Sequence, residues 1–261
     1  MGQGPSHDVA ELETRVEDPQ DGRRPEGLAL IAHGRLGGSF DQAPVRLLAE
    51  YFRNQRHLRV VTWNARGNGH SAGGNEWANF GNWQGDAYVD DYQRMLRDAM
   101  SRYAQDFPDA EHAQLFICSS DLMTGYSAGA IFAGCARPPR SSTQFAAPRY
   151  ILISYPVELN PIMAVFKTGS YFRSVEALVQ GYMVGKTWPP SSIVKSRPEV
   201  AGVLTISAEY DTKLFYSVWT GTLWSKNARG NLWHVVVEGA GHAWNEKAHC
   251  IVEEVDKWLT G

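Results

Sequence analysis

The residues best suited to chemistry begin with a serine set between glycines. Residues 125–129 read Gly-Tyr-Ser-Ala-Gly and fit the pattern G-x-S-x-G. In this pattern a sharp strand-to-helix turn leaves the serine hydroxyl exposed above a sheet. The helix that follows points the positive end of its dipole at the serine and favours developing negative charge there. Leu122-Met123-Thr124 precedes the turn and small residues follow it, so we expect Ser127 to be a nucleophile rather than part of an ordinary Gly-Ser turn.

A serine hydroxyl needs a general base at neutral pH. Of the eight histidines, His242 alone lies in a glycine-rich loop directly after a late apolar run, Val235–Val237. Such a loop allows the imidazole to swing over the edge of a sheet, so we predict His242 as the base, with a surface loop histidine as the alternative. His249 is expected in solvent on the last helix, and His234 is expected on a strand.

The histidine needs a carboxylate to orient its second ring nitrogen. Asp211 follows the apolar segment Val203–Ser207, between the serine and the histidine in the chain. Glu209, two residues earlier, is the alternative acid. We favour Asp211, since a carboxylate just beyond the strand end has room to reach across.

A tetrahedral intermediate also needs hydrogen-bond donors for its oxyanion. The backbone N–H of Ala128, directly after the nucleophile, is the first expected donor. The glycine-rich loop 33–38 should supply the second, from Arg35 or alternatively from Leu36. His33 is expected to hydrogen-bond within this loop and to transfer no proton. No metal and no cofactor is expected.

The hydrophobic patterns predict elements that would hold these residues in place. Short apolar runs alternate with segments of helical period, which favours an α/β fold with a mostly parallel sheet of about seven strands and helices on both faces. Residues 1–27 are predicted to be a polar tail containing one half-exposed strand, and residues 28–261 a single domain with a cap-like insertion at 155–200. The expected strands are 11–17, 28–32, 58–63, 150–154, 203–207 and 233–237; helices are expected from about 42, over 88–103, after 129 to about 136, and at the C-terminus.

Several of these motifs together resemble the α/β-hydrolase superfamily, and most closely its small, poorly characterised members, fungal ones included. The segments that carry the resemblance are Ala29–Asp41, Trp63–Ser71, Gly125–Ala130, Tyr150–Val157, Thr205–Asp211 and Glu238–His242. The resemblance implies a triad of Ser127, Asp211 and His242, in the chain order that this fold uses. It assigns Arg66 and His70 to a structural turn. Many relatives begin with an extra hairpin, whereas here one candidate strand precedes Leu28, so we expect seven strands or fewer instead of eight.

Composition excludes several other classes. The net charge is −3 and no basic stripe is present, which argues against a nucleic-acid partner. Three cysteines without a C-x-x-C pair favour reduced thiols and a cytoplasmic location. No apolar run is long enough to span a membrane, and no secretory signal is present. Gly2 and Ser6 fit a myristoylation pattern, but a single acyl chain anchors only marginally, so no stable membrane anchor is expected.

These features predict an esterase or thioesterase acting on a small or medium apolar compound. Leu36, Tyr126, Phe166 and Tyr171 are the expected pocket residues; the alternative for the last two is packing of the cap onto the sheet. A second hypothesis keeps the triad but uses it for cyclisation, C–C bond cleavage or acyl transfer. A third is a binding protein without catalysis, which the complete triad disfavours.

Overall fold

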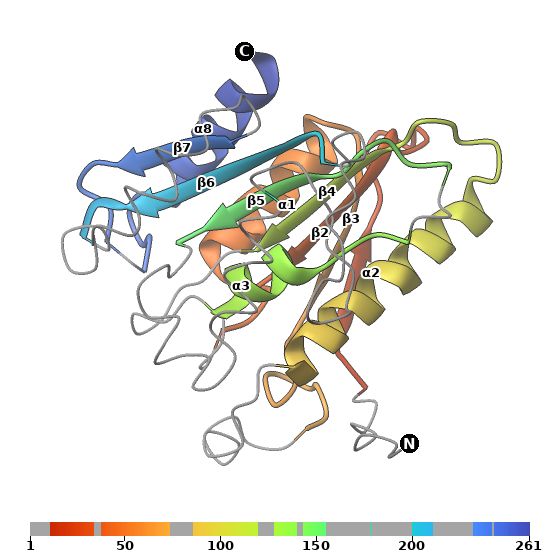
Figure 1. The fold of residues 1–261 in the computed structure, drawn as a ribbon, viewed down its shortest axis with the longest axis horizontal. Coiled ribbons are helices and arrows are strands. Elements are labelled where there is room, and N and C mark those ends of the chain that lie inside the picture. The colour runs from red at the N-terminus through yellow and green to blue at the C-terminus, as the bar shows by residue number, and fades with distance from the viewer. Residues whose placement is uncertain are drawn as a thin grey trace, which may run out of the picture.

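The computed structural model has a central seven-stranded sheet with helices on both sides (Figure 1). The residues that it describes are 11–33, 38–73, 86–119, 128–139, 143–154, 178, 200–210, 232–241 and 243–261.

The sheet has the strand order β1-β3-β2-β4-β5-β6-β7. All neighbouring strands pair in parallel except β1 and β3, which pair antiparallel. The chain moves from β2 to β3 on one side and then crosses to β4 on the other side, so the direction of winding changes between β2 and β4. The strands are β1 (Thr14–Glu17), β2 (Gly27–Ala32), β3 (Arg59–Trp63), β4 (Gln114–Ser119), β5 (Arg149–Ile153), β6 (Gly202–Ala208) and β7 (Leu232–Val237).

Two apolar layers hold the helices to the sheet. On one face α2 (Asp86–Asp106) and α3 (Ala128–Cys135) pack against β2 and β4. On the other face α1 (Ala43–Asn54) and α8 (Ala248–Thr260) pack against the sheet and each other. Buried strands read as near-continuous apolar runs because both faces are covered, and β2 has all six residues buried.

Each described helix follows from its sequence pattern. In α2, Tyr88, Tyr92, Leu96, Ala99 and Tyr103 recur at spacings of three and four, and all five side chains are buried. Pro44 lies in the first turn of α1, where its missing N–H leaves no helical hydrogen bond unmade. The α/β class, the mostly parallel sheet and the seven strands expected from the sequence are confirmed.

The N-terminal segment is more ordered than a loose tail from residue 11 onward. The half-exposed strand expected at 11–17 is present as β1, with Val16 exposed by 44%. Its four residues pair with β3 from Thr14 opposite Trp63 to Glu17 opposite Val60. This part of the expected tail is therefore the edge strand of the sheet.

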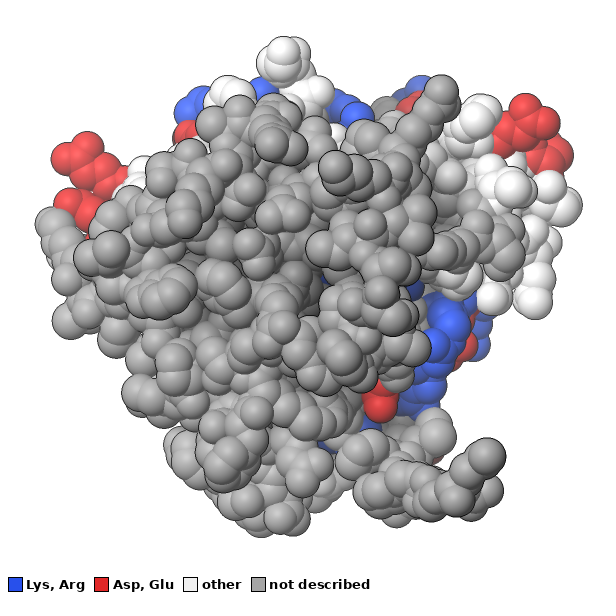
Figure 2. Space-filling model, viewed as in Figure 1, with Lys and Arg blue, Asp and Glu red and all other residues white. Residues whose placement is uncertain are grey.

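In the described part of the molecule, basic side chains lie beside acidic ones. In Figure 2, the Lys and Arg side chains on the right of this face lie beside Asp and Glu side chains. Arg59 of β3, for example, is bound by Asp18 and Asp106, and these hydrogen bonds raise its pKa. In the described ranges, no helix combines the length and apolar composition needed to cross a membrane.

Candidate active site

The change of winding direction between β2 and β4 identifies one point on the carboxyl edge of the sheet. Ala32, the last residue of β2, lies opposite both Trp63 of β3 and Ser119 of β4. In open α/β sheets, ligands bind in the crevice outside the carboxyl ends of the strands at such a point. The residues that follow Ala32, Trp63 and Ser119 are thus the first to consider for chemistry.

The first turn of helix α3 packs closely against the strand ends at this point. It begins at Ala128, and Gly129 packs against the ends of both neighbouring strands. A Cβ on Gly129 would lie 2.5 Å from Ser119 Oγ and 2.8 Å from the backbone oxygen of His33. The first turn of α3 can approach the strand ends only because this residue has no side chain. Ala128, the expected oxyanion donor, is the first residue of the helix, whereas Ser127 and Tyr126 lie outside the described residues.

His33 begins the loop in which the second oxyanion donor is expected. Its side chain is 3% exposed, and its Nε2 accepts a hydrogen bond from the backbone N–H of Ala65 at 2.8 Å. An accepting Nε2 in a neutral ring leaves the proton on Nδ1. This partner lies after β3, since the ends of β2 and β3 are adjacent. Arg35 and Leu36 themselves lie outside the described residues.

The loops after β6 and β7 are linked by two hydrogen bonds. The N–H of Tyr210 donates to the carbonyl oxygen of Ala240 at 3.2 Å. The N–H of Gly239 donates to Glu209 Oε2 at 2.8 Å. Asp211 and His242, predicted as the acid and the base, lie outside the described residues; their immediate predecessors Tyr210 and Gly241 belong to the linked loops.

The chain beyond position 242 is held by a buried tryptophan. Trp244 is 1% exposed, and its indole Nε1 donates a hydrogen bond to Ser154 Oγ at 3.0 Å. Ser154 directly follows β5, and its own N–H donates to the carbonyl oxygen of Ile206 in β6. The segments on both sides of position 242 are therefore attached to the carboxyl ends of β5 and β6.

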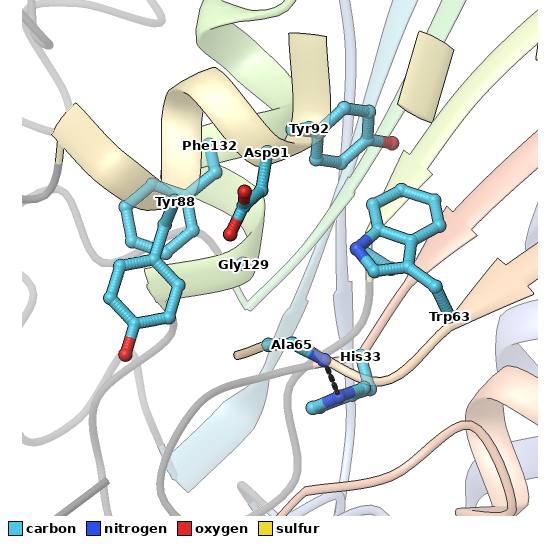
Figure 3. A pocket seen from close by; sticks show the side chains of 9 residues that line it. His33, Trp63, Ala65, Tyr88, Asp91, Tyr92, Gly129 and Phe132 are labelled. Atoms are coloured by element: carbon cyan, nitrogen blue, oxygen red, sulfur yellow. Dashed lines mark hydrogen bonds between the residues drawn. The ribbon is translucent and has the colours of Figure 1, made fainter. Parts of the chain in front are cut away.

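A small cavity lies beside the start of α3 and the end of β2 (Figure 3). Its volume is about 20 Å³, which is room for about one water molecule. Two aromatic pairs form part of its walls: Tyr88 stacks on Phe132 at 5.2 Å between ring centroids, and Trp63 meets Tyr92 edge-on at 4.8 Å. The residues that line it are Ala32, His33, Trp63, Ala65, Tyr88, Asp91, Tyr92, Gly129 and Phe132.

One wall of this cavity carries a buried ion pair. Asp91 of α2 accepts two hydrogen bonds from the guanidinium of Arg66, at 2.7 and 2.9 Å, and its side chain is 8% exposed. These bonds raise the pKa of Arg66. Asp91 is not among the site residues expected from the sequence. Asp91 lies three residues after Tyr88, on the apolar face of α2. This position indicates a buried ion pair, because a charge on a buried face needs a partner.

The expected cap residues Phe166 and Tyr171 also lie outside the described residues. Among the described residues, no group of three or more His, Cys, Asp or Glu side chains is arranged to hold a metal ion. Two other histidines lie as expected: His249 is exposed on α8, and His234 is on β7 with its Nδ1 2.8 Å from Thr205 Oγ1.

Comparison with known proteins identifies the architecture. No family model and no curated protein matches the chain. Solved structures do match over nearly the full length of both chains. They include an α/β serine hydrolase homologue from Coxiella burnetii (18% identity, 98% of this chain and 94% of that one, TM-score 0.59). Est1E from Butyrivibrio proteoclasticus, with ferulic acid bound, follows at 13% identity (97% and 96%, TM-score 0.56). Esterase 2 from Thermogutta terrifontis matches at 14% identity (96% and 89%, TM-score 0.54). The strand order, the crossing point between β2 and β4 and these likenesses together give one conclusion: the chain has the α/β-hydrolase fold.

Proposed function

We propose that the protein is a serine hydrolase that cleaves a carboxylic ester or thioester of a small or medium apolar compound. The observation that carries the proposal is the start of α3. The helix begins one residue after Ser127, and Gly129 packs against the ends of β2 and β4 without room for a side chain. A sharp strand-to-helix turn that exposes a serine hydroxyl requires such close packing.

In the proposed mechanism, Ser127 Oγ attacks the carbonyl carbon while His242 removes the hydroxyl proton. The N–H groups of Ala128 and Arg35 would stabilise the oxyanion of the tetrahedral intermediate. Collapse of the intermediate releases the alcohol or thiol, which takes its proton from His242. Water that gives a proton to His242 then attacks the acyl-enzyme; the carboxylic acid leaves, and His242 returns the proton to Ser127 Oγ.

The hydrogen bond between Gly239 and Glu209 supports Asp211 as the acid of the triad. Glu209 Oε2 already accepts a bond from the N–H of Gly239 and thereby joins the loops after β6 and β7. This bond gives Glu209 a function in joining the loops, and Asp211 is the acid expected from the sequence, because a carboxylate just beyond the strand end has room to reach across. We therefore assign the orienting role to Asp211.

We propose ester hydrolysis as the use of the triad. An esterase from Thermogutta terrifontis shares the fold, and because a fold does not determine a reaction, the assays below decide it. We further propose a cytoplasmic location, which the three free cysteines support, since disulfides are rare in reducing compartments.

A labelling experiment tests the proposal. A fluorophosphonate probe should label the native protein on Ser127, and Ser127→Ala should abolish labelling. Turnover of p-nitrophenyl esters should fall by about 10⁴ or more in the same variant. Full labelling of Ser127→Ala would reject this serine as the nucleophile. Native protein that is folded but neither labels nor turns over any ester from acetate to octanoate would reject the serine hydrolase.

A further inference from the structure

We propose that Asn64, oriented by Glu13, is the positioning residue of the loop 34–37, from which the second oxyanion donor is expected. The inference rests on the proposed serine hydrolase function. It makes Glu13, the residue before the edge strand β1, part of the catalytic apparatus: Thr14 lies opposite Trp63, so Glu13 lies at the carboxyl end of β3.

Two consecutive residues after β3 hold both ends of this loop. Before the loop, Nε2 of His33 accepts the hydrogen bond from the N–H of Ala65 (Figure 3). After the loop, the N–H of Phe40 donates to Asn64 Oδ1 at 3.0 Å. His33, Phe40 and Asn64 are each 5% exposed or less, so water does not compete for these bonds. The Asn64–Ala65 pair thus fixes where the loop leaves β2 and where it returns.

The orientation of the Asn64 amide follows from the chemistry of its partners. Asn64 Nδ2 donates to Glu13 Oε2 at 2.7 Å, and a carboxylate oxygen can only accept. Oδ1 must therefore face Phe40, whose N–H can only donate. The N–H of Asn64 also donates to the carbonyl oxygen of Glu13, so backbone and side chain are both attached to the same residue.

The turn after β3 closes over this contact. Glu13 Oε2 accepts a second hydrogen bond from the N–H of His70 at 2.9 Å. Gly69 adopts a φ of +53°, and a Cβ there would lie 2.3 Å from Asn64 Nδ2 and 2.6 Å from Glu13 Oε2. The bond from His70 also lowers the pKa of Glu13 and keeps the carboxylate charged. Glu13 is thereby fixed as the acceptor that sets the direction of the Asn64 amide.

The consequence for catalysis concerns the transition state more than the bound substrate. An oxyanion donor stabilises charge that develops only during the reaction, and loss of one such donor costs about 10²- to 10³-fold in kcat. A loop released at its Phe40 end keeps the donor but positions it less well. We expect Asn64→Ala to lower kcat by about 10- to 100-fold, with KM changed less than about threefold.

The test compares variants in the native full-length protein. Asn64→Ala removes the amide, and Glu13→Ala removes its orienting partner from a less buried position. Glu13→Gln serves as the conservative rescue, because its amide oxygen can accept the same bonds. Glu17→Ala is the matched control: it removes a carboxylate from β1 that binds Arg53 on α1 and does not contact Asn64.

Two inhibitors separate a positioning role from a general loss of structure. A trifluoromethyl ketone forms an oxyanion on the serine, whereas the matching secondary alcohol binds without one. Asn64→Ala and Glu13→Ala should weaken binding of the ketone by about 10-fold or more and leave binding of the alcohol unchanged. Glu13→Gln and Glu17→Ala should bind both inhibitors as the native protein does. Equal weakening of both inhibitors, or no weakening of either, would overturn the positioning role. Native protein that reacts with neither the ketone nor a fluorophosphonate would instead reject the proposed function.

Discussion

The carboxylate of Glu209 accepts a hydrogen bond from the N–H of Gly239, with 2.8 Å between donor and acceptor. Glu209 follows β6 and Gly239 follows β7, so this bond joins the two loops that carry the proposed acid and base. A second bond joins the same loops: the N–H of Tyr210 donates to the carbonyl oxygen of Ala240. A side chain that binds the backbone in this way acts as a brace between loops.

This arrangement predicts different effects for the two neighbouring acids. Asp211→Asn should lower kcat by about 10⁴, because the amide favours the wrong imidazole tautomer. Glu209→Gln should lower kcat by less than about tenfold, since the amide oxygen can still accept from Gly239. Steady-state kinetics on one ester, with thermal unfolding of both variants as a control, measures the difference. The opposite ranking of the two variants would make Glu209 the triad acid.

The ion pair of Arg66 and Asp91 should contribute strongly to stability. Both side chains are largely buried, at 16% and 8% exposure, so Arg66→Met leaves a carboxylate without its main partner. Removal of one member of a buried pair costs about 3 kcal/mol or more. We expect urea unfolding to show a loss of about that size with an unchanged m-value.

A neighbouring arginine provides the control for this measurement. Arg94 contacts the same carboxylate at a longer distance, 3.4 Å between its Nη2 and Asp91 Oδ1, and its side chain is 23% exposed. Arg94→Met should cost less than about 1 kcal/mol. Equal losses in the two variants would mean that the bidentate geometry of Arg66 adds nothing.

Many features of the fold follow from local patterns, and the contacts that hold the loops do not. The apolar runs at 28–32 and 203–207 and the stripe of α2 each reveal their element, because periodicity is a property of adjacent residues. The strand that leads toward Ser127 is described as far as Ser119, and the apolar residues 122–124 lie outside the described residues. Asn64 and Glu13 are 51 residues apart, and nothing in either segment alone indicates that they meet.

The half-buried histidine of β7, His234, should make stability depend on pH. Burial lowers the pKa of His234 from its ordinary value of about 6.5. Below that pH the unfolded chain binds a proton that the folded chain does not, so stability falls as the pH falls. Relative to His234→Gln, the native protein should lose up to about 1.4 kcal/mol per pH unit below pH 6.5. Parallel pH profiles for the native protein and His234→Gln would contradict the effect of burial.

The tight start of α3 gives a prediction that depends on two separate contacts. In Gly129→Ala the new methyl group would lie 2.5 Å from Ser119 Oγ and 2.8 Å from the backbone oxygen of His33. The contact with the Ser119 hydroxyl can be removed by substituting that serine. The contact with the His33 backbone oxygen can be relieved only by moving the loop that follows β2. Overpacking of this kind costs about 1–3 kcal/mol, and here it also displaces the helix that begins after Ser127. Gly129→Ala should therefore lose both stability and at least about 100-fold in fluorophosphonate labelling rate.

Ser119→Ala alone should label at the native rate. The double variant should regain stability but only part of the labelling rate, because the contact with His33 remains. Full recovery of labelling in the double variant would show that Ser119, and not the end of β2, sets the position of the helix.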